Sequence, residues 1–310
     1  MDPPAALTRS AAALFDLSRG RQALLSVAQP ALGAMLAIGG LPDGRTIAIG
    51  LAAATAGYLA VFSLNDVLDV KADRGALRVG SAAGGAESYD LDVAFLRHPL
   101  ARGDITLAFS IAWVGGLGSL AAVLAWVLSP VCLALFGLSV ALEAAYCALR
   151  SVTWLKTLVS GLMVGVGGLA GWAAVAPLAP RALPFFGFLA LWEIAARNLP
   201  NDLADLAADS ATGIRTVATT YGGRASAGGT LAGSVACPAL GAVMCGGWAG
   251  AALAAGLGVL TMLAPAFTLW RLPTPPQAGR YFNRASLYPA LLFATLLALL
   301  VGGGGLPAGG

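Results

Sequence analysis

NDVLDVKAD at residues 65–73 and NDLADLAAD at residues 201–209 are two copies of one nine-residue motif. Five of the nine positions are identical, and two more exchange valine for leucine. In each copy the aspartates fall at positions i, i+3 and i+7, which on a helix project within about 60° of one another. Each copy therefore predicts one carboxylate stripe, formed by Asp66, Asp69 and Asp73 in the first and by Asp202, Asp205 and Asp209 in the second.

The composition around these motifs is that of a membrane protein. Of the 310 residues, 58% are hydrophobic and only 11% are charged, whereas soluble domains carry about 25% charged residues. Such a chain cannot cover a globule with polar side chains, so we expect most of it to lie in lipid. The net charge of +3 is small, and no basic patch with interleaved aromatic residues indicates nucleic-acid binding. The four cysteines are scattered in apolar stretches, where they are expected as small buried hydrophobes.

Apolar stretches of about 20 residues are long enough to cross a bilayer. The predicted spans are about 22–41, 46–64, 105–128, 131–149, 157–178, 183–199, 225–245, 248–270 and 285–304. Two of these divisions are inferred, because uncharged stretches too long for one span are split at Ser129-Pro130 and near Gly246-Gly247. The sequence thus predicts an all-α membrane protein of about nine transmembrane helices, with residues 1–310 forming a single domain.

Basic residues predict the orientation of the chain. Of the 18 lysines and arginines, all but Arg45 and Arg181 fall at the N-terminus, in the loops after even-numbered spans or, for Arg197, near the end of the sixth span that leads into such a loop. Basic residues concentrate on the cytoplasmic side of membrane proteins. We therefore expect the N-terminus and both motifs to be cytoplasmic, in the inner membrane if the source is prokaryotic. The larger cytoplasmic segments, at about 65–104 and 198–224, would cap the domain.

Six carboxylates at one membrane face need a counter-charge. Like charges repel, and desolvation near lipid increases the cost. Oxygen ligands favour hard cations, and Mg²⁺ takes one or two carboxylates and completes its shell with water and substrate phosphate. Two facing stripes therefore favour a site for Mg²⁺ and a diphosphate over solvated helix caps. A cation-coupled secondary transporter is an alternative, but inverted repeats would place equivalent motifs at opposite faces or at the midplane.

Further segments of the chain resemble the UbiA superfamily of intramembrane prenyltransferases, of the 4-hydroxybenzoate polyprenyltransferase kind. The two acidic motifs of that family are similar to the two motifs of this chain, of which the first begins at Asn65 and the second at Asn201. GIRTVATTYG at 213–222 resembles the family's continuation of the second motif, and HPLARG at 98–103 resembles its RPLxxG segment. Tyr146 and Lys156 are similar to the tyrosine and lysine that family members place beside the diphosphate.

The resemblance implies a fold, a reaction and a set of site residues. The implied fold is nine helices around a central cavity, and the implied reaction is Mg²⁺-dependent transfer of a prenyl group from a prenyl diphosphate to an acceptor. An aromatic quinone precursor is the family's commonest acceptor, and a membrane terpene cyclase using the same donor is the alternative. The six aspartates would hold the metal, with Lys156 assisting departure of the diphosphate. The residues expected to bind substrate are Asn65, Glu143, Tyr146, Arg97, His98, Arg102, Arg197, Asn201 and Arg215.

His98 departs from the family pattern, because an arginine usually precedes the proline of the RPLxxG segment. Arg97 or Arg102 is then a candidate for supplying the positive charge, and the segment 74–97 is longer than in many members.

Three features inside the predicted spans each allow two interpretations of their role. Glu143 is an intramembrane acid on the helix face of Tyr146 and so a candidate base or acceptor contact. Glu193 and Arg197, spaced i and i+4, either neutralise each other or line the cavity. The glycines of the fifth span either make room for the prenyl tail or allow close helix packing; they are Gly165, Gly167, Gly168 and Gly171.

Overall fold

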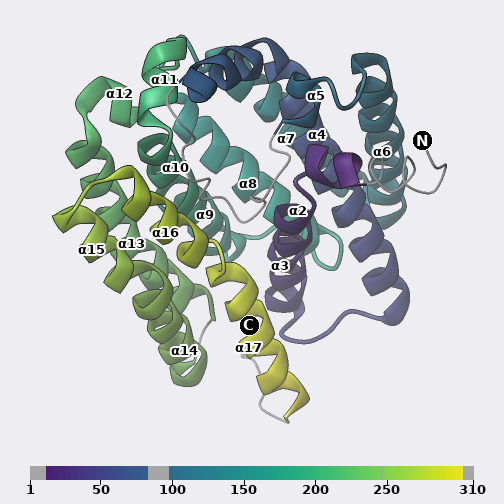
Figure 1. The fold of residues 1–310 in the computed structure, drawn as a ribbon. Coiled ribbons are helices and arrows are strands. Elements are labelled where there is room, and N and C mark those ends of the chain that lie inside the picture. Colours follow the sequence, from purple (N-terminus) through teal and green to yellow (C-terminus); the bar gives the residue numbers. More distant parts are fainter. Residues whose placement is uncertain (1–11, 83–97, 246, 303–310) are drawn as a thin grey trace.

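The structure is a computed structural model that describes residues 12–82, 98–245 and 247–302. Within these ranges every regular element is a helix, which confirms the predicted all-α class (Figure 1). The helices of the first half are α2 (Gly20–Ser26), α3 (Ala28–Ile38), α4 (Gly44–Ala82), α5 (Pro99–Arg102), α6 (Leu107–Leu128), α7 (Pro130–Leu149) and α8 (Lys156–Ala173). Those of the second half are α9 (Ala182–Trp192), η1 (Glu193–Asn198), α10 (Leu199–Ala204), α11 (Leu206–Thr212), α12 (Val217–Tyr221), α13 (Gly223–Cys245), α14 (Trp248–Gly258), η2 (Val259–Leu263), α15 (Ala264–Arg271), α16 (Pro275–Ala285) and α17 (Tyr288–Val301).

Both inferred divisions between adjacent spans are confirmed. Ser129 caps α7, accepting a hydrogen bond from the Cys132 backbone N–H, and Pro130 occupies the first turn, where a missing N–H costs nothing. Between α13 and α14, Gly247 has φ 56°, a backbone conformation that favours glycine.

The π-helical segments η1 and η2 both come shortly before a proline. Pro200 follows η1 by two residues, and Pro265 follows η2 by two residues. Proline cannot donate to the preceding turn and its ring clashes with the carbonyl four residues earlier. A widened turn relieves that conflict without ending the helix, so α9, η1 and α10 continue one another.

Six described helices are long and apolar enough to cross a membrane. They are Gly44–Lys71, Leu107–Leu128, Pro130–Leu149, Gly223–Cys245, Trp248–Arg271 and Pro275–Val301. The other three predicted spans coincide with α2–α3, α8 and α9–η1, which are helical but interrupted or less apolar. The count of nine is therefore not confirmed.

Apolar side chains face outward and polar side chains face inward in much of this bundle. Trp126, Val123 and Ile111 of α6 are more than half exposed, whereas Gln22 and Gln29 of the N-terminal helices are almost fully buried. Lipid can solvate such an apolar outer surface, and the interior, which also holds a large apolar core, must satisfy the buried polar groups.

Close packing of α8 against α3 and α9 fixes the centre of the molecule. A Cβ atom on Gly171 would overlap the backbone of Pro30, and one on Gly165 or Gly168 would overlap side chains of α9. A Cβ on Gly167 would meet only ordinary contacts, from Ser139 and Tyr58. Close helix packing, and not room for a prenyl tail, therefore accounts for three of these four glycines.

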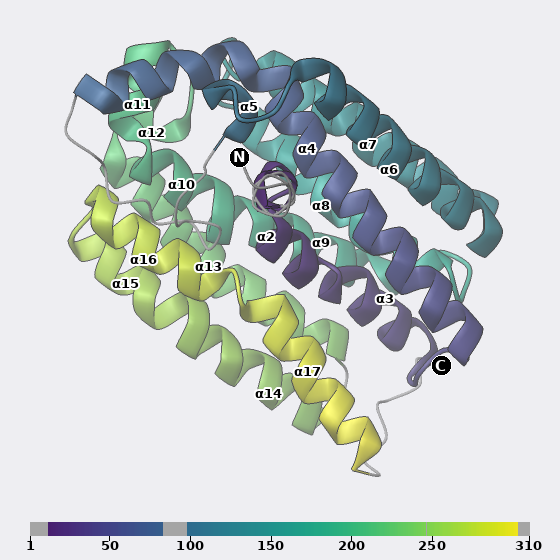
Figure 2. The ribbon, with the colours of Figure 1, turned by 45° about the vertical axis from the view of Figure 1, so that its right-hand side comes forward.

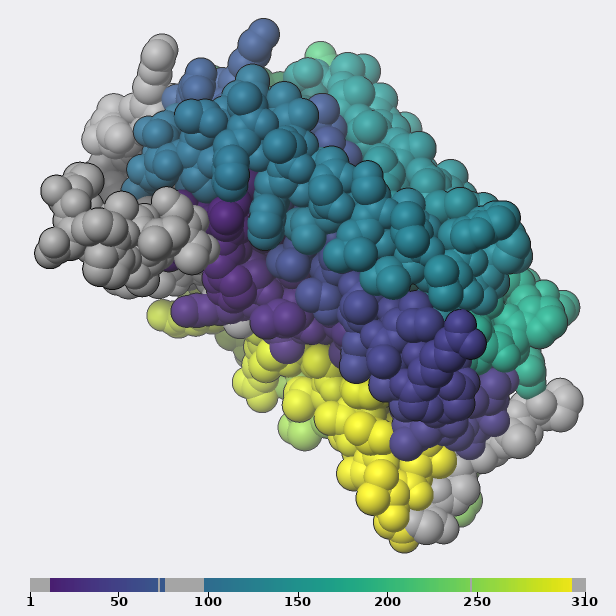
Figure 3. All heavy atoms as spheres, turned by 90° about the vertical axis from the view of Figure 1, so that its right-hand side faces the viewer, coloured from purple at the N-terminus to yellow at the C-terminus, as the bar shows by residue number. Residues whose placement is uncertain are grey.

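The N-terminal helix α3 and the C-terminal helix α17 lie side by side. α3 packs on α17, and in the space-filling view the yellow C-terminal helices lie beside the purple N-terminal ones (Figure 3). α4 is 39 residues long and extends well beyond its apolar part. Its C-terminal portion runs across the top of the bundle to α11 (Figure 2), and this brings the first motif to the second.

Candidate active site

The two acidic motifs lie at the same end of the bundle, as the sequence predicts. The first is on the continuous helix α4, and the second spans α10 and α11, of which α11 packs on α4. The last turns of α7 join both groups, because Glu143 bonds to Asn65 of the first motif and Tyr146 contacts Lys156, which pairs with Asp202 of the second.

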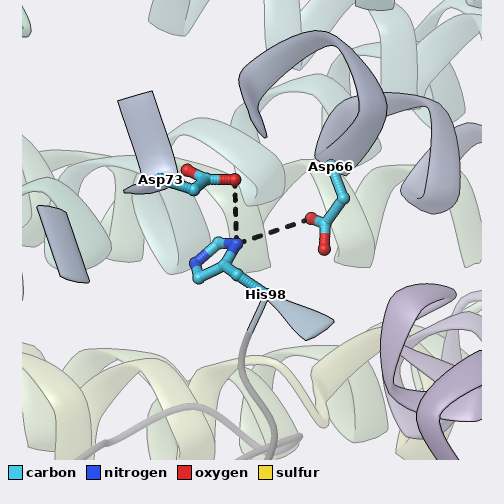
Figure 4. Close-up of side chains that lie close together, drawn as sticks. All are labelled: Asp66, Asp73 and His98. Atoms are coloured by element: carbon cyan, nitrogen blue, oxygen red, sulfur yellow. Dashed lines mark ion pairs between the residues drawn. The ribbon is translucent and has the colours of Figure 1, made fainter. Parts of the chain in front are cut away.

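Asp66 and Asp73 of the first motif converge on the ring of His98 (Figure 4). The Nδ1 atom of His98 is 3.0 Å from Asp73 Oδ2 and 3.8 Å from Asp66 Oδ1. Asp66 is almost fully buried, and its Oδ1 also lies 3.5 Å from the Arg19 guanidinium. These three side chains offer oxygen and nitrogen atoms that all lie within 4.8 Å of one another.

Asp69 of the first motif is linked to the loop after the second motif through Arg150. Arg150 Nη1 lies 2.6 Å from Asp69 Oδ2, and the Arg150 carbonyl accepts a hydrogen bond of 2.7 Å from the Arg215 backbone N–H. The GIRT segment is thus held by its backbone, while the Arg215 side chain is exposed.

The prediction of one continuous helix for the second motif is wrong. α10 ends at Ala204 and α11 begins at Leu206, with Asp205 between them at φ −92° and ψ 10°. The Asn201 amide bonds to Asp205 at 3.2 Å. The second motif is therefore divided between two short helices, with Asp202 on α10 and Asp209 on α11.

Lys156 and Asp202 form a buried ion pair at the start of α8. The two groups are 3.2 Å apart, and their side chains are 3% and 5% exposed. Lys156 Nζ also donates to the Tyr146 hydroxyl at 3.3 Å and lies 4.9 Å from the centre of that ring. Burial alone would lower the pKa of Lys156, but Tyr146 and Asp202 outweigh it and raise that pKa. Burial raises the pKa of Asp202 to about 6, against the charge of Lys156, which lowers it.

Arg19 belongs to the site, although no motif pointed to it. Its guanidinium donates to Asn65 Oδ1 at 3.2 Å, and Asn65 in turn donates to Glu143 Oε1 at 2.7 Å. Arg19 has φ 44°, a left-handed conformation that is uncommon outside glycine. Such strain persists only where the surroundings impose it. The buried Glu143 positions Asn65 through its hydrogen bond. No spacing pattern in the sequence connects Arg19 or Arg150 with the motifs.

The HPLARG segment forms the short helix α5 between two left-handed residues. His98 precedes it at φ 60°, and Gly103 ends it at φ 86°, where glycine is the unstrained choice. Arg102 forms an ion pair with Asp104 at 3.2 Å. Arg97 lies outside the described residues, so the two candidates for the missing charge remain predictions.

Glu193 and Arg197 pair with each other, as one interpretation predicts, and Arg197 also lines a pocket, as the other predicts. The two side chains pair at 3.5 Å, and Glu193 also accepts hydrogen bonds from Ser160 and Asn198. Arg197 donates to Gln22. A small pocket with room for about one water molecule opens beside Arg197, lined also by Gln22, Leu25, Ser26, Gln29, Trp192, Ser286, Pro289 and Ala290.

The donor atoms at the motif end fit a divalent metal. Asp202 Oδ2 is buried and forms no hydrogen bond within the described part of the chain, which is costly unless another group binds it. Carboxylate oxygens are the ligands that Mg²⁺ prefers. The aspartates of both motifs could therefore hold such ions, together with a negatively charged ligand that would contact Lys156.

The fold and this site define an all-helical membrane protein with an acidic, lysine-containing centre at one end of its bundle. The sequence model of the UbiA prenyltransferase family matches residues 26–297. The chain therefore belongs to the UbiA prenyltransferase family, which confirms the resemblance. A search of the curated proteins finds no match.

Solved structures of UbiA homologues share the fold. One is the apo UbiA homologue of Aeropyrum pernix K1, with TM-score 0.70, 18% identity and coverage of 90% of this chain and 98% of that one. Another is the Archaeoglobus fulgidus homologue bound to DMAPP and Mg²⁺, with TM-score 0.69, 15% identity and coverage of 93% and 99%. A third, from work on digeranylgeranylglyceryl phosphate synthase, has TM-score 0.65, 14% identity and coverage of 94% and 98%.

Proposed function

We propose that the protein transfers a prenyl group from a prenyl diphosphate to an acceptor within the membrane, using Mg²⁺. The observation that carries the proposal is the buried pair of Lys156 with Asp202 of the second motif, at the end of the bundle where both acidic motifs lie. The titles of two Archaeoglobus fulgidus homologue structures support it, because they name DMAPP or GPP together with Mg²⁺.

The carboxylates of both motifs would hold the metal, and the metal would neutralise charge that develops on the leaving diphosphate. Lys156 would contact the same diphosphate, because its ammonium is fixed by Tyr146 and Asp202 and faces no bulk water. Arg19 and Arg150, which pair with Asp66 and Asp69, would add positive charge around the first motif. Asn65, held by Glu143, would orient that motif.

For the acceptor we propose an aromatic compound of the quinone-precursor type, which is the commonest case in the family. The pocket beside Arg197 is small, but its lining would suit a ligand with both an aromatic ring and polar groups. Trp192 lines this pocket, and Arg197 lies 5.6 Å from its ring, while Gln22 and Ser286 supply polar atoms. We place the acidic end of the bundle at the cytoplasmic face of the membrane, on the distribution of basic residues.

Replacing one carboxylate in each motif tests the requirement for both. We expect Asp69→Asn and Asp205→Asn, made separately, each to lower Mg²⁺-dependent prenyl transfer at least about tenfold, because each removes a charged oxygen from a metal site. Asp43→Asn, which changes an exposed carboxylate before α4, is the matched control and should retain activity. Full activity in either motif variant would refute the two-motif site.

The donor and the acceptor can be identified with the purified chain in membranes. Prenyl diphosphates of increasing length are combined with aromatic acids, other acceptors or no acceptor, and products are read by mass spectrometry. We expect prenylated aromatic products that need Mg²⁺. A cyclised hydrocarbon formed from the donor alone would identify a terpene cyclase instead.

A further inference from the structure

We propose that His98 is a nitrogen ligand of the metal ion held by the first acidic motif. Compared with a site made only of carboxylates, the site formed by Asp66, Asp73 and His98 would then have a stronger preference for divalent ions that bind imidazole, such as Co²⁺. This inference rests on the proposed function in that it concerns the metal of the same site.

The first argument is the convergence of three donor atoms. The three residues come from two separate segments, α4 and the residue before α5, and one ligand atom of each lies within 4.8 Å of the others (Figure 4). His98 Nδ1 itself lies 3.8 Å from Asp66 Oδ1 and 3.0 Å from Asp73 Oδ2. Ligands bound at about 2.1 Å to one ion lie about 3 Å apart when adjacent and about 4 Å apart when opposite. The observed separations of 3.0 and 3.8 Å fall in this range.

The second argument is the geometry of the short contact itself. Although His98 Nδ1 is 3.0 Å from Asp73 Oδ2, the contact does not meet the angles of a hydrogen bond, and Nδ1 is a buried atom without a hydrogen-bond partner among the described residues. An imidazole placed to donate to Asp73 would align its N–H with the carboxylate oxygen. An imidazole nitrogen directed between two carboxylates can use its lone pair to bind the same metal ion as the carboxylate oxygens.

The third argument is that the backbone places the ring with precision. His98 has φ 60° and ψ 58°, followed by the buried residues Pro99 and Leu100, and α5 packs on α4. A non-glycine residue in this region is strained, and such strain is concentrated at ligand sites. The neighbouring carboxylates also have cations of their own, Arg19 for Asp66 and Arg150 for Asp69, so the site has less need of His98 as a third positive charge.

A nitrogen ligand changes which ions the site prefers. Imidazole suits Co²⁺, Ni²⁺, Zn²⁺ and Fe²⁺, whereas Mg²⁺ prefers oxygen ligands. The second motif, with Asp202, Asp205 and Asp209, supplies carboxylate oxygens. The two halves of the site would therefore differ in metal preference, and the difference would depend on one side chain.

His98 is the single histidine of the chain, and this makes the test direct. The full-length protein, purified with an affinity tag that contains no histidine, is loaded with Mn²⁺, and pulsed electron paramagnetic resonance records ¹⁴N coupling from a bound imidazole. We expect that coupling in the wild type and its loss in His98→Gln and His98→Arg. Wild-type protein with bound Mn²⁺ and no imidazole coupling would overturn the inference.

Metal affinities separate a ligand from a positive charge. We expect both His98→Gln and His98→Arg to weaken Co²⁺ binding at least about tenfold and Mg²⁺ binding less than about threefold. If His98 served only as a cation, His98→Arg would bind both metals like the wild type, and that result would contradict the proposal. The Asp43→Asn control should leave both affinities unchanged.

Prenyl transfer by the wild type is measured on the same preparations with Mg²⁺. This measurement distinguishes a failure of the His98 proposal from a failure of the proposed function. Transfer without imidazole coupling would overturn only the role of His98. Imidazole coupling without transfer to any acceptor would support the metal site and overturn the proposed reaction.

Discussion

Lys156→Met is expected to reduce the kcat of prenyl transfer by about 10²–10³-fold, the loss typical of removing one charge-stabilising group from a transition state. The Lys156 ammonium is 3% exposed and is fixed between Tyr146 and Asp202, so neither water nor a flexible neighbour can replace it. Measurement of kcat and KM in detergent or nanodiscs checks this result, and a variant with wild-type kcat would exclude Lys156 from the reaction.

The stability of the same variant must be measured beside its activity. Lys156→Met leaves the charge of Asp202 buried without its partner, which typically costs about 3–5 kcal/mol. We therefore expect a lower unfolding temperature. In Lys156→Met with Asp202→Asn the buried charge is gone, and we expect much of the stability to return while activity stays low. Activity that recovered with stability would show that Lys156 acts only through folding.

Gly171→Ala is expected to destabilise the fold by more than about 2 kcal/mol, at the upper part of the range for overpacking. The added Cβ would overlap the backbone of Pro30 in α3, which cannot move aside as a flexible side chain could. The shift would separate α3 from α8, which carries Lys156 at its first position. Thermal unfolding followed by the fluorescence of the 7 tryptophans measures the effect.

Gly118→Ala is the matched control for this substitution. Gly118 lies inside α6, and a Cβ atom there would meet nothing within 4 Å. Alanine is the better helix former by roughly 0.5–1 kcal/mol, so this variant should be as stable as the wild type or slightly more stable. Equal losses in both variants would mean that packing against Pro30 is not the cause.

The position of the helices was largely predictable from the sequence, because the length of an apolar stretch is a local property. The divisions at Ser129-Pro130 and Gly246-Gly247 were predicted correctly, since proline and glycine act on their own turns. The extent of α4 was not predicted. Its apolar part ends near the first motif, but the helix continues to Ala82 over the top of the bundle and packs on α11.

The acids of the site were predictable from the motifs and Lys156 from the family resemblance, whereas Arg19 and Arg150 were not predicted. Asp66, Asp73 and Asp202 belong to a repeat that is visible in one reading of the chain. Arg19 and Arg150 pair with Asp66 and Asp69 from distant positions, and neither lies at a fixed spacing from a motif. An ion pair across 46 or more residues depends on how helices dock, and no local pattern records that.

The sequence by itself determined the class of the protein: an all-helical membrane chain whose two acidic repeats lie on one face, because hydropathy and charge act residue by residue. Only the tertiary structure decided how the repeats are used. In that structure the helix of the second motif is interrupted at Asp205, Lys156 pairs with Asp202, and His98 lies close to both Asp66 and Asp73. The physical reason is that carboxylates, cations and imidazole interact at separations of a few ångströms, which helix packing sets and sequence spacing does not.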